Sequence, residues 1–187
     1  MKNMTVTQWC HHFLSMQIQP GDVCIDATAG NGNDTLKLAE LTGDSGTVYA
    51  FDIQKQALEA TYQKLSSANL DKQVTLIHDG HEHMASYIAP DTVSCIVFNL
   101  GYLPGGDHKI STKADTTVFA VRCGLTLLKR QGMMFLCIYQ GGDTGFEEHD
   151  QVLEFLKQLD PKKYLVILSS YYNRPNTPPD LALIIRT

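Results

Sequence analysis

Short apolar runs alternate with stretches of helical periodicity along this chain of 187 residues. The apolar runs predict strands at residues 23–25, 47–51, 74–77, 92–98, 133–139, 164–169 and 181–185. Between them, apolar residues spaced three and four apart predict helices over residues 34–41, 54–67, 111–129 and 147–159. A further helix over residues 5–16, capped by Thr5, precedes the first strand.

This order of elements predicts a Rossmann-like α/β fold, a parallel sheet with helices on both faces. The last two strands are the exception, because only a loop of about ten residues joins them, whereas a parallel crossover needs about a dozen or more. We therefore predict a seven-stranded, mostly parallel sheet whose last strand is antiparallel. No internal repeat or low-complexity tract interrupts the pattern.

A glycine-rich turn follows the first predicted strand in DVCIDATAGNGND. Gly30 and Gly32 let a nucleoside or anionic ligand approach the backbone closely, at the start of a helix. A dinucleotide fingerprint would need a third glycine where Thr35 stands. With Asp26 the pattern is D-x-x-x-G-x-G, similar to the first motif of class I S-adenosylmethionine (AdoMet) methyltransferases, and an acid suits the methionine ammonium group. A plain structural turn is the alternative.

Candidate cofactor contacts follow the first three strands, because ligands of open parallel sheets bind beyond the carboxyl ends of the strands. Asp52 is placed to accept both ribose hydroxyls, with Gln54 beside it, and His81 can reach the adenine edge. His81 and His83 have no further ligand at a supporting spacing, so we predict no metal site. The predicted AdoMet-binding residues are Asp26, Gly30, Asn31, Asn33, Asp52, Gln54, Gly80 and His81.

The fourth strand runs into NLGYLPGGD, which resembles the (D/N)-P-P-(Y/F) motif of amino-group methyltransferases, with Leu-Gly in place of Pro-Pro. The Asn99 oxygen and a backbone carbonyl at Leu100 or Gly101 can accept two N–H bonds of an amine and aim its lone pair. Tyr102 can stack on a flat base, and Asp107 can take a proton from a charged amine. The alternative is a tight turn in which Asn99 only satisfies backbone groups.

DATAGNGNDT, AFDIQ, FNLGYLPGGD and the terminal N-x-x-x-x-P-P segment together resemble the small bacterial "putative rRNA methylase" family of the MnmM (YtqB) type, over nearly the whole chain. The resemblance implies AdoMet-dependent N-methylation of 5-aminomethyl-2-thiouridine at the tRNA wobble position, giving 5-methylaminomethyl-2-thiouridine. The anticodon arm of tRNA would be the partner. One departure concerns substrate placement, because the family often has Y-H-G-H where this chain has Tyr139-Gln140-Gly141-Gly142, and glutamine cannot titrate.

The net charge of -5 argues against a protein that coats nucleic acid non-specifically. Residues 1–100 carry 5 Lys and Arg against 11 Asp and Glu, whereas residues 101–187 carry 10 against 9, which leaves room for a basic face in the second half. We predict substrate contacts from Lys113, Asn173 and Arg174, since a few phosphate contacts suffice for recognition of an RNA loop by shape. Trp9 is expected in the core rather than as a platform for a base.

The five cysteines are scattered, and Cys24, Cys95 and Cys137 lie in apolar runs where we expect buried thiols, which suits a reducing cytoplasm. Neither a signal peptide nor an apolar span of about 20 residues is evident, so no membrane partner is expected. We expect one methyltransferase domain over residues 1–187, with the helix of residues 1–20 packed on it; a homodimer stays open. A small-molecule amine or rRNA methyltransferase, and a non-catalytic AdoMet- or nucleotide-binding module, are the alternative functions.

Overall fold

The computed structural model describes residues 4–101, 112–140, 145–176 and 178–187. Within these ranges the strands are β1 (Val23–Asp26), β2 (Thr47–Phe51), β3 (Val74–Ile77), β4 (Val93–Leu100), β5 (Leu128–Ile138), β6 (Tyr164–Ser169) and β7 (Asp180–Arg186). The helices are α1 (Val6–Gln17), α2 (Asn33–Thr42), α3 (Lys55–Ser67), η1 (His81–Ser86, a 3₁₀ helix), α4 (Ala114–Leu127) and α5 (Gly145–Lys157).

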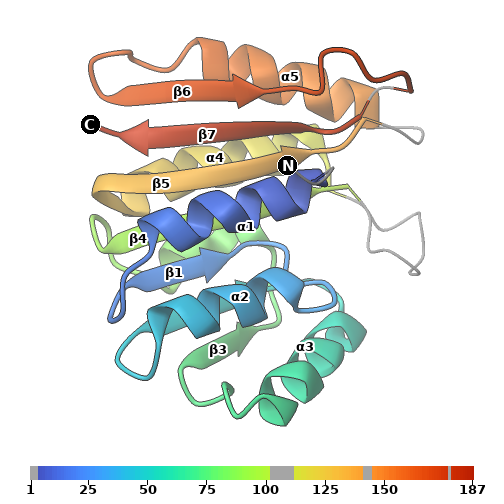
Figure 1. The fold of residues 1–187 in the computed structure, drawn as a ribbon. Helices are drawn as coiled ribbons and strands as arrows, with labels where there is room; N and C mark the ends of the chain where they lie inside the picture. The colour runs from blue at the N-terminus through green and yellow to red at the C-terminus, as the bar shows by residue number, and fades with distance from the viewer. Residues whose placement is uncertain (1–3, 102–111, 141–144, 177) are drawn as a thin grey trace.

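The strands of the described ranges form one sheet in the order β3-β2-β1-β4-β5-β7-β6. Neighbouring strands from β3 to β5 run parallel, whereas β7 is antiparallel to both β5 and β6. Figure 1 shows the β7 arrow pointing against the others. This pairing confirms the prediction that the last strand is antiparallel. The physical reason is that the short β6–β7 connection leaves no room for a crossover helix.

Helices cover both faces of the sheet (Figure 1). On one face α1, α2 and α3 bury their apolar sides against a cluster that includes Cys24, Val97, Cys137 and Leu181. On the other face α4, α5 and η1 pack against the alternate residues of the same strands, among them Phe98. Since side chains alternate along a strand, the side chain of Asn99 lies on the same face as Val97, toward α1.

Several element boundaries differ from the sequence predictions. The helix predicted over residues 111–129 begins at Ala114, and the strand predicted from residue 133 begins at Leu128, with no loop between them. The polar stretch from Lys129 to Gln131 lacks the alternation of a strand, yet it follows the first β5 pair, Val93 with Leu128. The register between β4 and β5 shifts there, and Gln131 adopts a φ of 64°.

The N-terminal helix begins as predicted. Thr5 accepts a hydrogen bond from the Gln8 backbone, and the Gln8 side chain accepts one from the Thr5 backbone, which makes a capping box. The predicted burial of Cys24, Cys95 and Cys137 is confirmed. Trp9 packs against the core cluster on the α1 face of the sheet, as expected, but it is only half-buried and also lines a surface cleft.

Candidate active site at the carboxyl edge of the sheet

The turn between β1 and α2 requires glycine at two positions. Gly30 and Gly32 have φ values of 53° and 72°, in the left-handed region that favours glycine. A Cβ at Gly32 would also lie 2.8 Å from the Thr61 hydroxyl of α3. The turn is therefore a tight backbone curve held against α3, directly at the start of α2.

Asp26, the last residue of β1, is wholly buried. Its carboxylate accepts hydrogen bonds from the Thr28 backbone N–H at 3.1 Å and the Thr35 hydroxyl at 2.6 Å. Burial, followed by the nearby charge of Asp34, raises the pKa of Asp26 to about 7. Asp26 thus ties β1 to α2, and its predicted contact with the methionine part of AdoMet stays a prediction.

Asp52 is oriented by two backbone donors. The N–H of Gly30 donates to one carboxylate oxygen at 2.9 Å, and the N–H of Gln54 donates to the other at 2.8 Å. Each carboxylate oxygen has a second lone pair, so the group can still accept ribose hydroxyls. The side chain is half-buried at the tip of β2, where the sequence predicts the ribose contact.

His81 begins η1 and is buried against the β1 loop. Its Nδ1 lies 3.3 Å from the carbonyl oxygen of Ala27, and its ring meets Phe98 edge-on. Burial lowers the pKa of His81, so the imidazole is neutral at pH 7. His83 faces elsewhere, toward the carboxylate of Asp79 at 2.8 Å.

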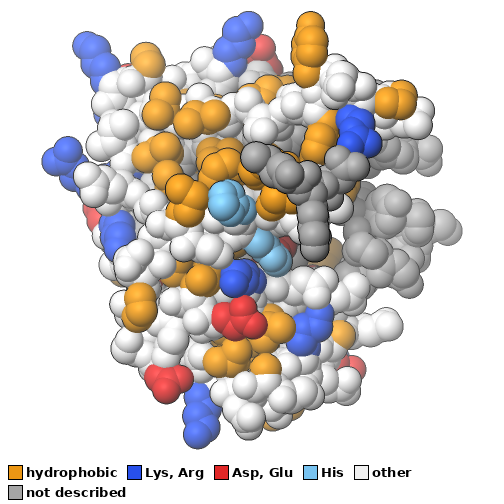
Figure 2. All heavy atoms as spheres, in the orientation of Figure 1, with side chains coloured by type: hydrophobic (Ala, Val, Ile, Leu, Met, Phe, Trp, Pro, Cys, Tyr) orange, Lys and Arg blue, Asp and Glu red, His pale blue; other side chains and the backbone are white. Residues whose placement is uncertain are grey.

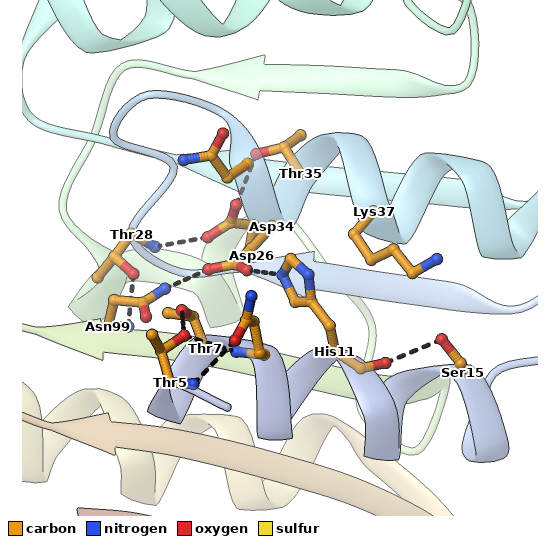
Figure 3. Close-up of polar contacts among 12 residues, drawn as sticks. Thr5, Thr7, His11, Ser15, Asp26, Thr28, Asp34, Thr35, Lys37 and Asn99 are labelled. Atoms are coloured by element: carbon orange, nitrogen blue, oxygen red, sulfur yellow. Dashed lines mark hydrogen bonds and ion pairs between the residues drawn. The ribbon is translucent and has the colours of Figure 1, made fainter. Parts of the chain in front are cut away.

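Asn99 lies at the centre of a polar network that links four elements (Figure 3). Its backbone N–H donates to the Thr28 hydroxyl at 2.8 Å, and its Nδ2 donates to one carboxylate oxygen of Asp34. The other oxygen of Asp34 is hydrogen-bonded to Nε2 of His11 in α1. The sequence assigned no site role to Asp34 or His11, because no local pattern links residues 23 and 65 positions apart.

The side-chain oxygen of Asn99 has no hydrogen-bond partner among the described residues. Oδ1 is buried and accepts no hydrogen bond from the described part of the chain, although Nδ2 of the same amide is bound to Asp34. An unpaired buried carbonyl oxygen costs free energy, which a ligand with an N–H donor would recover. At the tip of β4 the Asn99 amide is therefore held by Nδ2, while its Oδ1 accepts no hydrogen bond from the described residues.

A second network fixes the backbone just after Asn99. Gly101 exchanges two hydrogen bonds with Thr112, through the backbone N–H of Thr112 at 2.9 Å and the hydroxyl of Thr112 at 2.8 Å. The buried carboxylate of Glu148, in the first turn of α5, accepts the hydroxyls of Thr112 and Thr117 at 2.7 and 2.6 Å. The sequence did not predict this role for Glu148, since a glutamate in the first turn of a helix is usually exposed to solvent.

Gln140, where the sequence departs from the family pattern, is not isolated. Its Nε2 lies 2.8 Å from Nε2 of His149 in α5 and 3.4 Å from the carboxylate of Asp180 in β7. His149 in turn contacts Asp180 at 3.1 Å. The fold therefore brings an imidazole from α5 next to the glutamine that follows β5.

The remaining predicted residues are spread along this edge. Asn31 is exposed, and so is Asn33, whose side-chain oxygen accepts a hydrogen bond from Lys64 at 2.5 Å. Lys113 is the exposed N-cap residue of α4. Asn173 and Arg174 lie after β6, two strands beyond β5, and do not join the Asn99 network. The residues predicted to stack on the base and to take a proton, Tyr102 and Asp107, lie outside the described residues, as does Gly142.

The described residues contain neither a candidate metal cluster nor a membrane-spanning helix. No group of three or more His, Cys, Asp or Glu side chains there could hold a metal ion. In the same ranges, no helix is both long and apolar enough to cross a membrane.

The strand order, with β7 antiparallel between β5 and β6 and helices on both faces of the sheet, defines the class I methyltransferase fold. The fold is shared with a "putative methyltransferase" from Streptococcus mutans solved in complex with SAH. That structure is 38% identical, covers all of both chains and superposes with a TM-score of 0.89.

Residues 48–185 match the family described as "Putative rRNA methylase", and the chain belongs to this family. A "putative rRNA-methylase" from Clostridium thermocellum is 45% identical over the whole of both chains, with a TM-score of 0.97. A curated relative from Arabidopsis thaliana, named tRNA (mnm(5)s(2)U34)-methyltransferase, chloroplastic, is 38% identical over 181 residues, which cover 92% of this chain. The match spans 66% of the length of that relative.

Proposed function

We propose that this protein is an AdoMet-dependent N-methyltransferase that converts 5-aminomethyl-2-thiouridine at the tRNA wobble position to 5-methylaminomethyl-2-thiouridine. The substrate is inferred from the Arabidopsis relative, which is 38% identical and named for this modified nucleoside. The observation in this chain that carries the proposal is the buried, unpaired Oδ1 of Asn99 at the tip of β4. An amine is a ligand that supplies the missing N–H donor.

AdoMet is inferred as the cofactor because a relative of 38% identity was solved with SAH, its demethylated product. The residues at the β1, β2 and β3 tips fit an adenosyl group. Asp52 keeps free lone pairs for ribose hydroxyls, and neutral His81 supplies a hydrogen-bonding wall. Asp26, Gly30, Asn31, Asn33, Gln54 and Gly80 would complete the pocket. When bound, AdoMet supplies an activated methyl group.

The chain's own part in the reaction is alignment. Asn99 Oδ1 accepts one N–H of the amine, while Asp34 and His11 hold the amide in the orientation that presents this oxygen. The Gly101 carbonyl accepts from Thr112 and has a second lone pair for the other N–H. Tyr102 as a stacking platform and Asp107 as a proton acceptor complete the proposal. The amine is then neutral, with its lone pair facing the methyl donor.

The proposal is tested with Asn99→Ala and Asp52→Asn on tRNA from cells that lack the enzyme, with wobble nucleosides measured by mass spectrometry. We expect Asn99→Ala to lower kcat on the order of 100-fold, the cost of losing alignment at a reacting atom. Its AdoMet affinity, measured by calorimetry, should stay within about threefold, a shift of under 1 kcal/mol. Asp52→Asn should weaken AdoMet binding instead. Equal loss of both properties in Asn99→Ala would make Asn99 a scaffold residue.

rRNA is a second candidate substrate, because the family description itself names it. The same mass spectrometry on rRNA from cells with and without the protein separates the two substrates. A methyl group that disappears only from rRNA would overturn the tRNA proposal. An enzyme for a small-molecule amine would instead show RNA affinity without the steep dependence on salt that phosphate contacts produce.

Three further inferences concern the setting of the protein. We infer that the anticodon arm is the part of tRNA that is bound, since the wobble base lies there, and that the protein acts in the cytoplasm. A homodimer stays a prediction, to be measured by sedimentation. The surface that could support it is edge strand β6, where Leu165, Ile167 and Leu168 are each 44–50% exposed.

A further inference from the structure

A surface cleft of about 430 Å³ lies between the first turns of α1 and the segment that follows β6. Figure 2 shows the face that carries α1, where hydrophobic side chains gather over α1 and the β5–β7–β6 side of the sheet. The cleft is lined by Met4, Val6, Trp9, Ser169, Ser170, Tyr171, Tyr172, Asn173, Arg174 and Leu181.

The cleft lies close to the proposed reaction site. Asn99 of β4 pairs with Cys137 of β5, Cys137 pairs with Leu181 of β7, and Leu181 pairs with Ser169 of β6. Neighbouring strands are about 4.8 Å apart, so Leu181 stands roughly 10 Å from Asn99 along this row. Leu181, Cys137 and the Asn99 side chain share the α1 face of the sheet. Cys137 and Leu181 are buried in the core cluster that α1 covers, so this row sets only the short separation between Asn99 and the cleft.

Helix α1 connects the two places directly. His11 of α1 is bonded to Asp34, which holds Asn99, while Trp9, one half-turn earlier, lines the cleft. The walls of the cleft are also fixed. Trp9 stacks on Phe13 with ring centroids 6.2 Å apart, and the Tyr171 hydroxyl donates to the carbonyl of Met4 at 2.5 Å. The rings of Trp9 and Tyr171 are thus already held in place before a ligand arrives.

The lining has the chemistry of a site for an unpaired nucleotide. It carries three aromatic rings, one arginine and one asparagine, and none of its ten residues is acidic, although the whole chain has a net charge of -5. Tyr172 is fully exposed beside the cleft. Aromatic rings stack on bases of any sequence, and arginine binds phosphate.

We propose that this cleft binds an unpaired nucleotide of the RNA substrate, one that neighbours the nucleotide methylated at Asn99. The proposal rests on the proposed function for the identity of the RNA and for the place of methyl transfer at Asn99. The base of the bound nucleotide stacks against Trp9 and Tyr172, and its phosphate is bound by Arg174. The cleft therefore contributes to RNA affinity and leaves the methyl-transfer step to Asn99.

Trp9 is the only tryptophan of the chain, so its fluorescence reports this cleft alone. The probe is an unmodified single-stranded RNA heptanucleotide, titrated at low salt, with total binding followed in parallel by anisotropy of an end-labelled copy. We expect saturable quenching of Trp9 at the same RNA concentrations that give the anisotropy change. Tyr172→Ala should weaken this binding at least fivefold, the lower end of the loss for one stacked base. Arg174→Ala should also weaken it and make it less dependent on salt, because one phosphate contact is lost.

The matched control is Tyr62→Ala, because Tyr62 is an exposed aromatic residue in a cleft of similar size, about 410 Å³, between α3 and β3. Its RNA affinity should equal that of the unaltered protein. In methyl transfer to tRNA, Tyr172→Ala should raise KM and leave kcat within about twofold. RNA binding without quenching of Trp9, or equal losses in Tyr172→Ala and Tyr62→Ala, overturns the proposal. Quenching without methyl transfer to tRNA refutes only the proposed function.

Discussion

Replacing Asp26 by asparagine tests how strongly the fold controls a buried charge. The pKa of Asp26 is about 7 in the folded chain, against 3.8 for an ordinary aspartate. As the pH rises, the unfolded chain releases this proton first, so the free energy of unfolding falls between about pH 4 and pH 7. A difference of about 3 pKa units at about 1.4 kcal/mol each gives a total near 4 kcal/mol. By the same relation, about 3 kcal/mol of this falls between pH 5 and pH 8.

The substituted asparagine would be neutral at every pH and would keep the hydrogen bonds, since its oxygen can accept from the Thr28 N–H and its Nδ2 can donate to the Thr35 hydroxyl. We therefore expect Asp26→Asn to gain about 3 kcal/mol of stability relative to the unaltered protein between pH 5 and pH 8.

Urea unfolding of both proteins at pH 5 and pH 8 measures this double difference, which cancels the titration of the groups that do not interact with Asp26. Asp44→Asn, in the exposed turn after α2, is the matched control for the loss of one carboxylate. It should show no comparable pH-dependent gain. A double difference below about 0.5 kcal/mol for Asp26→Asn would show that burial does not hold the proton on this carboxyl group.

Two further substitutions probe the loops around the site. Gly32→Ala should lower the free energy of unfolding by about 2 kcal/mol or more in urea titrations, because φ is 72° and the new Cβ would meet Thr61 at 2.8 Å. Glu148→Gln should cost about 1–3 kcal/mol of stability, since an amide cannot accept both the Thr112 and Thr117 hydroxyls in the same way. It should also lower kcat at unchanged AdoMet affinity, measured as for Asn99→Ala, by loosening the backbone at the substrate.

Each of these substitutions has a matched control in the chain. Gly43 has a similar φ of 61°, but a Cβ there would meet no atom within 4 Å, so Gly43→Ala should cost less than Gly32→Ala. Equal costs would remove the contact with Thr61 from the explanation. Glu147 is the exposed neighbour of Glu148, and Glu147→Gln should leave both stability and kcat nearly unchanged. A kcat for Glu148→Gln as high as that of the control would show that the loop does not need this carboxylate.

The sequence predicts most of the elements because their signals are local. Thr5 caps α1, the β6 and β7 strands are joined by a short connection, and the apolar runs match the sheet. It fails at the start of β5, where Leu128 pairs with Val93 of β4 and the polar residues Lys129–Gln131 continue the strand through a register shift before pairing resumes at Met133. Pairing with a neighbouring strand overrides local preference there.

The sequence by itself determined the glycine turn, the acids that end β1 and β2, and the motif at the tip of β4, since each depends on residues close together in the chain. Only the tertiary structure decided that Asp34 and His11 hold Asn99, that Glu148 fixes Gly101, and that Trp9 lines a cleft. These contacts join residues from separate elements, brought together by the packing of α1 and α5 on the sheet. Local sequence patterns do not predict contacts between residues far apart in the chain. The burial of the apolar helix faces against the sheet brings these residues together.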